Sequence, residues 1–235
     1  MKKYYFDEHE DTYQLMKSEN ISAWDEFHDP KSYSFDQFMM RPFLDRAFTM
    51  IDLSKSGLQA FEYGCGTGAG ACYLANRGFT VDAVDISPTA IQMAAGRNPG
   101  INFRVQDLLE LTGLDKKYDL ILDNYCLQSI VTDEDRAKLF SIVSSGLKAS
   151  GYYIVSSAIF NGIRTYENSY YDSDTGIVYE KIQDPEAYGA AAVMINGEWW
   201  LPHRRHRTAE ALREELQYAG FQVVFHEEGS FILQK

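Results

Sequence analysis

From residue 58 onward the chain alternates short apolar runs with longer amphipathic segments. Apolar runs of strand length followed by helical periodicity are typical of a parallel sheet with helices on both faces. Strands are expected at about 58–63, 80–85, 101–105, 118–123, 151–157, 221–227 and 230–235. Helices are expected at about 68–77, 88–96, 133–147 and 207–219. The pattern therefore predicts an α/β domain.

Residues at the expected helix ends support these limits. Ser87 and Thr132 stand where N-caps belong, because their hydroxyls can accept hydrogen bonds from the first backbone N–H groups of a helix. Gly151 and Gly220 follow expected helices, where glycine commonly ends the helical conformation. The last two strands are separated only by about residues 228–229, which predicts an antiparallel hairpin.

Two segments depart from the alternation. Residues 1–48 are acidic and aromatic, and 35–48 has apolar residues at helical spacing, so we expect a mostly helical segment that packs on the sheet or closes the site as a lid. Residues 158–206 hold many Tyr and Trp side chains and follow the fifth strand. We expect them to form an insertion that covers the substrate, since ligands bind at the carboxyl ends of such strands.

Within this insertion the sequence predicts a small antiparallel sheet. The segments 176–181 and 192–200 have the composition of strands. The second contains Asn196-Gly197, a dipeptide that favours a tight turn.

Composition and charge narrow the possible functions. The chain has 235 residues, of which 45% are hydrophobic, enough for the core of a single domain spanning 1–235. The formal net charge is −12, and the only dense basic stretch is Arg204-Arg205-His206-Arg207. Binding a nucleic-acid backbone requires many cations, so we expect no nucleic-acid partner and favour a small-molecule substrate.

The three cysteines, Cys65, Cys72 and Cys126, indicate reduced thiols and a cytoplasmic location. Their spacing makes no zinc site, and His203 and His206 lack a third ligand, so no metal is expected. No secretory signal and no apolar run of roughly 20 residues is present, which predicts no membrane association. A monomer or a homodimer is expected.

The segment after the first expected strand is the most informative. It reads Phe61-Glu62-Tyr63-Gly64-Cys65-Gly66-Thr67-Gly68, a strand that turns into a helix. Glycine permits such a turn and lets a ligand approach the backbone, and the helix start offers free N–H groups. With Ala69 and the later Asp85 it also satisfies the dinucleotide pattern G-x-G-x-x-G/A. The loop alone therefore predicts a nucleotide-like cofactor without identifying it.

Several motifs in order resemble the class I S-adenosylmethionine-dependent methyltransferases of the small-molecule type. The resemblance covers about 57–157 and 207–235 and rests on Glu62-x-Gly64-x-Gly66-x-Gly68, Asp85-Ile86-Ser87-Pro88, Val105-Gln106-Asp107-Leu108, the strand and exit loop 118–127, the turn 147–153 and the helix end 213–221. It implies a Rossmann-like doubly wound sheet of seven strands, mostly parallel, with a C-terminal antiparallel hairpin.

The resemblance also implies S-adenosylmethionine as the cofactor and assigns residues to it. Asp85 would accept hydrogen bonds from both ribose hydroxyls, and Asp107 would hold the adenine amino group. Glu62 would orient the free amino group at the methionine end of the cofactor. Arg41 or Tyr33 would meet the methionine carboxylate. The expected cofactor site comprises Tyr33, Arg41, Glu62, Gly64, Cys65, Gly66, Gly68, Asp85, Ile86, Asp107, Leu108, Asp123 and Asn124.

Methyl transfer from a sulfonium is an in-line displacement at carbon, so the acceptor must be aligned and water excluded. We expect transfer to oxygen or nitrogen of a small acceptor under an aromatic lid. If the acceptor is a hydroxyl group, a general base that removes its proton would accelerate the transfer. His203 and His28 are candidates for this base, and Glu198 is a further one. No catalytic residue is assigned. The expected substrate residues are Trp24, Trp199, Trp200, His203 and Arg204.

Two alternatives stay open. An NAD(P)-dependent oxidoreductase would rest a pyrophosphate on the helix start, where the charge of Glu62 would be unfavourable. The Tyr-x-x-x-Lys pair of short-chain oxidoreductases is also missing at Tyr166 and Tyr188. The other alternative is a non-catalytic methyltransferase-like binding module, which would not require Glu62 and Asp85 to persist together with the glycine loop.

Overall fold

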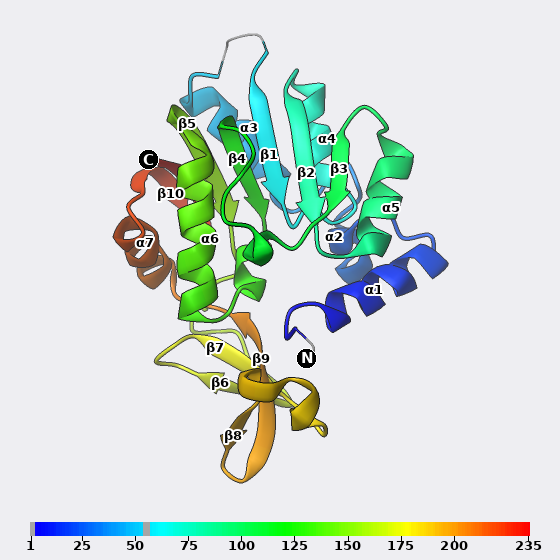
Figure 1. The fold of residues 1–235 in the computed structure, drawn as a ribbon, viewed down its shortest axis with the longest axis vertical. Coiled ribbons are helices and arrows are strands. Elements are labelled where there is room, and N and C mark those ends of the chain that lie inside the picture. The colour runs from blue at the N-terminus through cyan, green and yellow to red at the C-terminus, as the bar shows by residue number, and fades with distance from the viewer. Residues whose placement is uncertain (1–2, 54–56) are drawn as a thin grey trace.

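The computed structural model describes residues 3–53 and 57–235, so the first two residues of the expected 1–48 lid lie outside it. A seven-stranded sheet has helices on both faces, and a four-stranded sheet lies below the carboxyl ends of its parallel strands (Figure 1). The order in the large sheet is β10-β11-β5-β4-β1-β2-β3. Its strands are β1 (Gln59–Tyr63), β2 (Thr80–Asp85), β3 (Asn102–Val105), β4 (Tyr118–Asn124), β5 (Leu147–Ser156), β10 (Gln222–Glu227) and β11 (Ser230–Gln234).

The direction of these strands confirms the expected fold class. Strands β1 to β5 pair in parallel, whereas β11 runs antiparallel to both β5 and β10. Strands β10 and β11 form the predicted hairpin. The chain is therefore a Rossmann-like α/β fold with a mostly parallel seven-stranded sheet.

Seven α-helices surround the sheet in the described part of the chain. They are α1 (Asp7–Ser18), α2 (Trp24–His28), α3 (Arg41–Met50), α4 (Ala69–Asn76), α5 (Pro88–Arg97), α6 (Asp133–Gly146) and α7 (Ala209–Tyr218). The hydroxyls of Ser87 and Thr132 accept hydrogen bonds from Ala90 and Asp135, which confirms both predicted N-caps. Gly220 follows α7 with φ +91°. The prediction for Gly151 was wrong, because α6 ends before β5 and Gly151 lies inside that strand.

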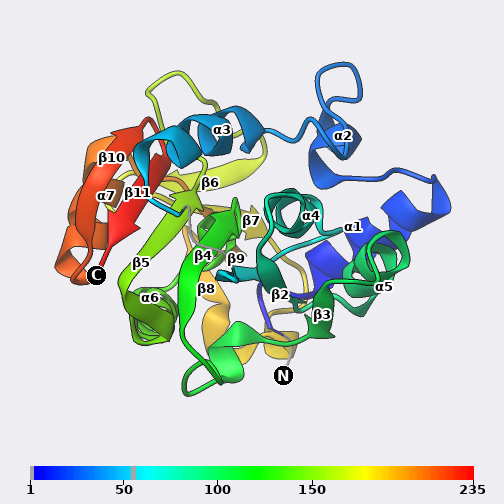
Figure 2. The ribbon, with the colours of Figure 1, turned by 90° about the horizontal axis from the view of Figure 1, so that it is seen from above.

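Alternation along each strand divides the apolar side chains between two cores. In β1, Ala60 packs with α3, α4 and α5, whereas Phe61 and Tyr63 pack with α6 and α7. Because successive side chains of a strand point to opposite faces, one buried strand serves both cores. Figure 2 shows α3 and α4 on one side of the sheet and α6 on the other.

The insertion forms the small sheet, in the order β6-β7-β9-β8. Its strands are β6 (Ser169–Asp172), β7 (Ile177–Lys181), β8 (Val193–Ile195) and β9 (Glu198–Arg205), and it also contains the 3₁₀ turns η3 (Pro185–Ala187) and η4 (Gly189–Ala191). The turn at Asn196-Gly197 is confirmed, since both residues have positive φ and β8 pairs with β9 across it. The single strand expected at 192–200 was wrong, because this turn divides it.

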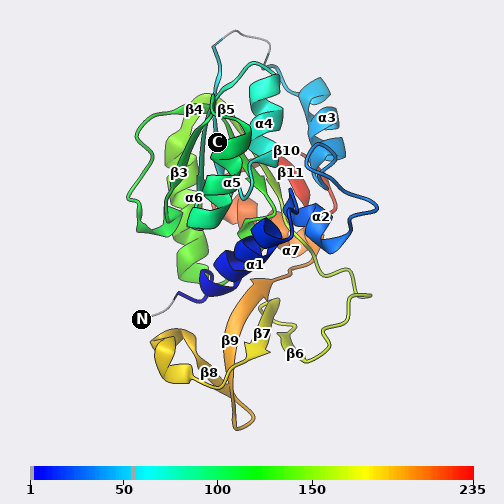
Figure 3. The same cartoon turned by 90° about the vertical axis from the view of Figure 1, so that its right-hand side faces the viewer.

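Two long-range attachments place the insertion and the N-terminal helix at the carboxyl ends of the main strands. Arg205 at the end of β9 donates to the carbonyl of Val131 and pairs with Asp133 at 2.5 Å. Glu10 of α1 accepts hydrogen bonds from Ser87 and Thr89 at the start of α5. Figure 3 shows α1 running between the small sheet and the helices of the main domain.

Candidate cofactor and acceptor site

A cavity of about 680 Å³ opens at the carboxyl ends of β1, β2 and β4. One part of its wall comes from the glycine loop, the end of β2 and the loop after β4. The other part comes from α1, α2 and the insertion. The cavity therefore lies between the main sheet on one side and α1, α2 and the insertion on the other.

The glycine loop is tightly packed on both sides. Gly64 and Gly66 have φ +57° and +53°, a left-handed conformation that side chains disfavour. A Cβ on Gly64 would lie 2.3 Å from Cys126 Sγ, and one on Gly66 would lie 2.6 Å from the Tyr13 hydroxyl. The absence of both side chains therefore lets the exit loop of β4 and helix α1 approach the loop.

Asp85 ends β2 and ties the glycine loop to the start of α5. Its Oδ2 accepts the Gly66 N–H and its Oδ1 accepts the Ser87 N–H, both at 2.8 Å. Burial raises its pKa to about 6, although these two hydrogen bonds favour the ionised form. A carboxylate has about four acceptor positions, so lone pairs remain for a ligand that enters the cavity.

Glu62 is a buried acid without a hydrogen-bond partner. Neither carboxylate oxygen has one among the described residues, and the side chain is fully buried below Gly70 of α4. Burial raises its pKa well above the usual value, and the charges of Asp123 and Asp85 raise it further, against the opposing influence of the Ala71 amide. Glu62 does not line the cavity but lies behind its wall, and a cation in the cavity would favour its ionised form.

Asp123 holds the exit loop of β4 in place. It accepts the hydroxyl of Tyr63 at 2.5 Å and the backbone N–H groups of Cys126 and Leu127 at 2.6 and 3.0 Å. Burial raises its pKa to about 7. Tyr125 in this loop has φ +65°, so the loop is held in a conformation that a non-glycine residue rarely adopts.

A buried arginine supports the next turn, η2 (Leu127–Ser129). Arg136 donates to the carbonyls of Leu127 and Ile130 and forms a two-pronged ion pair with Glu215. Arg136 thereby fixes the backbone on either side of Gln128 and Ser129, which both line the cavity.

Asp107 is bound by the N-terminal segment. Its Oδ2 lies 2.5 Å from Lys3 Nζ and accepts the Tyr5 hydroxyl at 2.9 Å, while Oδ1 accepts the Leu109 N–H. The residue that the resemblance assigns to the adenine amino group is thus already engaged by the N-terminus. One acceptor position of the carboxylate remains.

The acceptor part of the cavity contains several histidines in different environments. His9 of α1 donates from Nδ1 to the Tyr5 carbonyl at 2.9 Å, which leaves Nε2 as an acceptor, 3.4 Å from the Ser129 hydroxyl. Its ring stacks on Trp24. Burial, and then the charge of Arg204, lower the pKa of His9 to about 4, so the ring is neutral.

His203 is engaged on both ring nitrogens. Nδ1 lies 3.0 Å from Glu8, and Nε2 lies 3.5 Å from Glu180. Glu8 also pairs with Arg204. Burial by itself would raise the pKa of Glu8, but the hydrogen bond from His203 and the charge of Arg204 outweigh it and lower the pKa to about 2. The carboxylate is therefore ionised.

The structure places the predicted site residues in three groups. The first lines the cavity: Gly64, Cys65, Gly66, Asp85, Ile86, Asp107, Leu108, Asn124, Trp24, His28, His203 and Arg204. The second supports the wall from behind: Glu62, Gly68 at the start of α4, and Asp123. The third lies outside the cavity: Tyr33, Arg41, Trp199 and Trp200.

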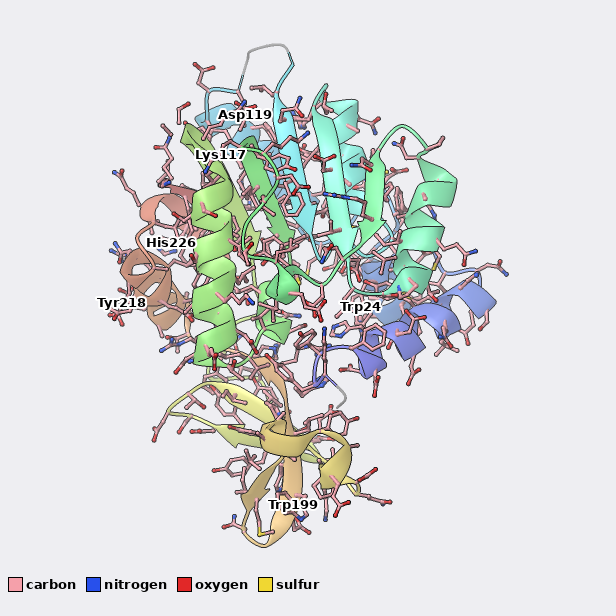
Figure 4. The ribbon with its side chains drawn as sticks, in the orientation of Figure 1. Trp24, Lys117, Asp119, Trp199, Tyr218 and His226 are labelled. Atoms are coloured by element: carbon pink, nitrogen blue, oxygen red, sulfur yellow. The ribbon has the colours of Figure 1, made fainter. Side chains whose placement is uncertain are left out.

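Arg41 lines a separate hollow of about 230 Å³ and pairs with Asp45 there. Figure 4 shows Trp199 at the outer end of the small sheet, far from Trp24 beside α1. Arg41, predicted to meet the methionine carboxylate, and Trp199 and Trp200, predicted to contact the substrate, therefore lie away from the cavity.

The cavity is also lined by His9, Tyr13 and Arg164, which were not predicted from the sequence. A signal existed for the first two, because Tyr5, His9 and Tyr13 follow each other at intervals of four and share one face of a helix. Arg164 lies in an irregular segment, where no periodic signal exists.

Residues 3–53 and 57–235 contain no group of three or more His, Cys, Asp or Glu side chains suited to a metal ion. In the same ranges, no helix has the length and apolar character needed to cross a membrane.

Known proteins resemble this chain in sequence. Residues 60–151 match the family described as Methyltransferase domain. This match includes the glycine loop and Asp85, so residues 60–151 are similar to methyltransferase domains.

The names of the following two relatives state a substrate. The 2-heptyl-1-hydroxyquinolin-4(1H)-one methyltransferase of Mycobacteroides abscessus is 31% identical over 111 residues, 45% of this chain and 49% of the relative. Phosphoethanolamine N-methyltransferase 1 of Zea mays is 30% identical over 141 residues, 57% of this chain and 27% of the relative. The chain thus spans half or less of the length of these relatives.

The fold of nearly all of the chain resembles that of a solved structure. The solved DhpI–SAH complex aligns with a TM-score of 0.62 over 99% of this chain and 97% of that one, at 17% identity. The likeness therefore includes the N-terminal helices and the insertion, outside the part that matches the methyltransferase family.

Proposed function

We propose that this chain transfers the methyl group of S-adenosylmethionine to an oxygen or nitrogen atom of a small acceptor. The observation that carries the proposal is the set of buried carboxylates Glu62, Asp85 and Asp123 around the glycine loop. Burial raises the pKa of each, and none forms an ion pair with a described residue. Such a site favours a cation, because an opposite charge stabilises ionised acids in a low-dielectric environment.

The cofactor fits the residues present. Its sulfonium and amino groups carry positive charge, which would offset Glu62 and Asp123 from across the wall. Asp85 would accept the ribose hydroxyls on its remaining lone pairs, and the glycine-loop backbone allows close approach. When bound, S-adenosylmethionine supplies an electrophilic methyl carbon. A dinucleotide would instead bring a pyrophosphate towards three acids.

The acceptor would lie between the exit loop of β4 and α1. Gln128 and Ser129 face this space from the sheet, and His9 and Trp24 face it from the N-terminal segment. In this arrangement His9 Nε2 would take the proton from an acceptor hydroxyl. We favour His9 over His203, because both nitrogens of His203 already face carboxylates.

The relatives' names, a methyltransferase for a hydroxyquinolinone and an N-methyltransferase for phosphoethanolamine, support a small-molecule acceptor. We also propose that 1–235 acts as one domain, with 1–48 and 158–206 enclosing the reactants. Tyr5, Tyr13, Trp24 and Phe38 are the aromatic residues of 1–48 that line the cavity.

Calorimetry on the full chain tests the cofactor. S-Adenosylmethionine and S-adenosylhomocysteine should bind with one-to-one stoichiometry, whereas NAD and NADP should give no heat of binding. Turnover of a panel of hydroxyl and amine acceptors, followed by the formation of S-adenosylhomocysteine, then separates an enzyme from a binding module. Binding of NAD in place of S-adenosylmethionine would overturn the proposal.

A further inference from the structure

An arginine without an acidic partner lies in the acceptor part of the cavity. Nine of the eleven arginines in this chain form ion pairs, as expected where acids outnumber bases by 34 to 22. Arg164 makes none with a described residue, although it lines the cavity. Its charge is therefore available to a ligand.

The side chain of Arg164 is directed by a buried histidine. Arg164 Nη1 lies 3.1 Å from His206 Nδ1 and 3.3 Å from Nε2, and the hydroxyl of Tyr166 lies 2.8 Å from the same Nδ1. Burial, and then Arg164 itself, lower the pKa of His206 to about 3. The imidazole is thus neutral, and it positions the guanidinium without offsetting its charge.

The backbone next to Arg164 is also held. The Asn161 side-chain oxygen accepts the N–H groups of Ile163 and Arg164 at 3.1 and 3.3 Å. Because that oxygen is engaged, the amide NH₂ of Asn161 remains as a donor, and Asn161 lines the cavity.

Gln128 presents a second amide in the same way. Its Oε1 accepts the Ala158 N–H at 2.7 Å, so its NH₂ group remains as a donor at the cavity wall. Arg164, Asn161 and Gln128 therefore offer donors on this side of the cavity. Guanidinium and amide donors together are typical partners of an oxyanion.

None of the described acids that line the cavity, which are Glu8, Asp25, Asp85, Asp107 and Glu228, forms an ion pair with Arg164. Glu8 is paired with Arg204 and His203, and Asp25 accepts the Met39 N–H.

We propose that Arg164, with Asn161 and Gln128, forms a subsite for an oxyanion, a carboxylate or a phosphate, carried by the methyl acceptor. This inference rests on the proposed function and names the substrate class. The anionic group would anchor one end of the acceptor in the insertion, and the nucleophilic atom would lie towards Ser129 and His9.

Calorimetry with three ligands of similar shape tests the subsite. Phenyl phosphate, benzoate and uncharged benzamide are titrated into the full chain saturated with S-adenosylhomocysteine. At least one anion should bind about tenfold or more tightly than benzamide, the effect of one charge-assisted hydrogen bond. The preferred anion identifies the oxyanion as phosphate or carboxylate.

Variants assign the effect to the arginine. Arg164→Gln and Arg164→Ala should abolish the preference for the anion, while Arg213→Gln, an exposed arginine on α7, should retain it. Circular dichroism verifies the fold, and Arg164 is an exposed residue whose replacement should be tolerated. No preference for an anion in the unaltered protein, or a preference that survives both substitutions, overturns the inference. Titration of the same samples with S-adenosylmethionine reports separately on the proposed function.

Discussion

The affinity for S-adenosylmethionine should rise about tenfold between pH 5 and pH 7, and Asp85 should cause most of that rise. Burial raises the pKa of this carboxyl to about 6, so in the ligand-free protein it is mostly protonated at pH 5 and mostly ionised at pH 7. Ribose hydroxyls donate to the ionised form, and a cation nearby also favours it. Binding should therefore lower the pKa and release a proton.

The magnitude follows from linkage. If the bound cofactor returns the Asp85 pKa to its ordinary value of about 4, each unit of difference is worth a factor of ten in affinity where the free carboxyl is protonated. A pH of 5 is about one unit below the pKa of Asp85 in the ligand-free protein, so the affinity is about tenfold lower than for the fully ionised carboxylate. At pH 7 the loss nearly vanishes.

Calorimetry at pH 5.0, 6.0 and 7.0 measures this effect, in buffers of different ionisation enthalpy that count the released proton. The range lies below the pKa of about 8 of an α-amino group, so the ligand's amine stays charged. S-Adenosylhomocysteine shares the ribose but lacks the sulfonium. A rise common to both ligands reports on Asp85, and an additional rise for S-adenosylmethionine reports on the cation near Glu62 and Asp123.

Asp85→Asn should flatten the pH dependence and weaken binding at pH 7 by about 1.5–3 kcal/mol, the usual contribution of hydrogen bonds to a charged group. Asp115→Asn, at an exposed acid, is the matched control. Affinities that stay within a factor of two from pH 5 to pH 7 in a folded protein would refute the reasoning, as would an unchanged pH profile in Asp85→Asn.

Three further substitutions test other parts of the structure. His9→Phe keeps a ring beside Trp24 but removes the acceptor nitrogen; with a hydroxyl acceptor, kcat should fall roughly 10²- to 10⁴-fold while the cofactor affinity stays unchanged, and an unaltered kcat would exclude His9 as the base. Gly70→Ala would place a Cβ 2.2 Å from Glu62 Oε1 and should lower the free energy of unfolding by about 1–3 kcal/mol in urea titrations; equal stability would mean that the Glu62 carboxyl moves freely. Arg136→Met should cost about 3–5 kcal/mol in the same assay, because it leaves Glu215 and two buried carbonyls without their partner, and a loss below 1 kcal/mol would contradict that role.

The elements of the main domain could be predicted because their signals are local. The cap at Thr132 lies within a few residues of the groups it binds, and β1 is a short, continuously buried run, as expected for a central strand covered on both faces. The glycine loop and Asp85 were likewise recognisable, because their spacing follows from a strand, a turn and the next strand. By contrast, Gly151 was misread, since nothing nearby in the sequence distinguishes a glycine at a helix end from one inside a strand.

The cavity depends on contacts between distant segments. Asp107 is engaged by Lys3, 104 positions away, and His9 faces Ser129 across 120 positions. Composition drew attention to Trp199 and Trp200, but the direction of β8 and β9 carries Trp199 to the outer end of the small sheet (Figure 4).

The succession of strands and helices along the chain, the glycine turn and the acid that ends β2 were determined by the sequence alone, because backbone conformation and burial periodicity act over a few residues. Which polar groups meet in the cavity was decided only by the tertiary structure. The partners of a buried charge are chosen by how α1 and the insertion pack over the carboxyl ends of the sheet. That packing sums many weak contacts between segments far apart in the chain, so no short motif records it.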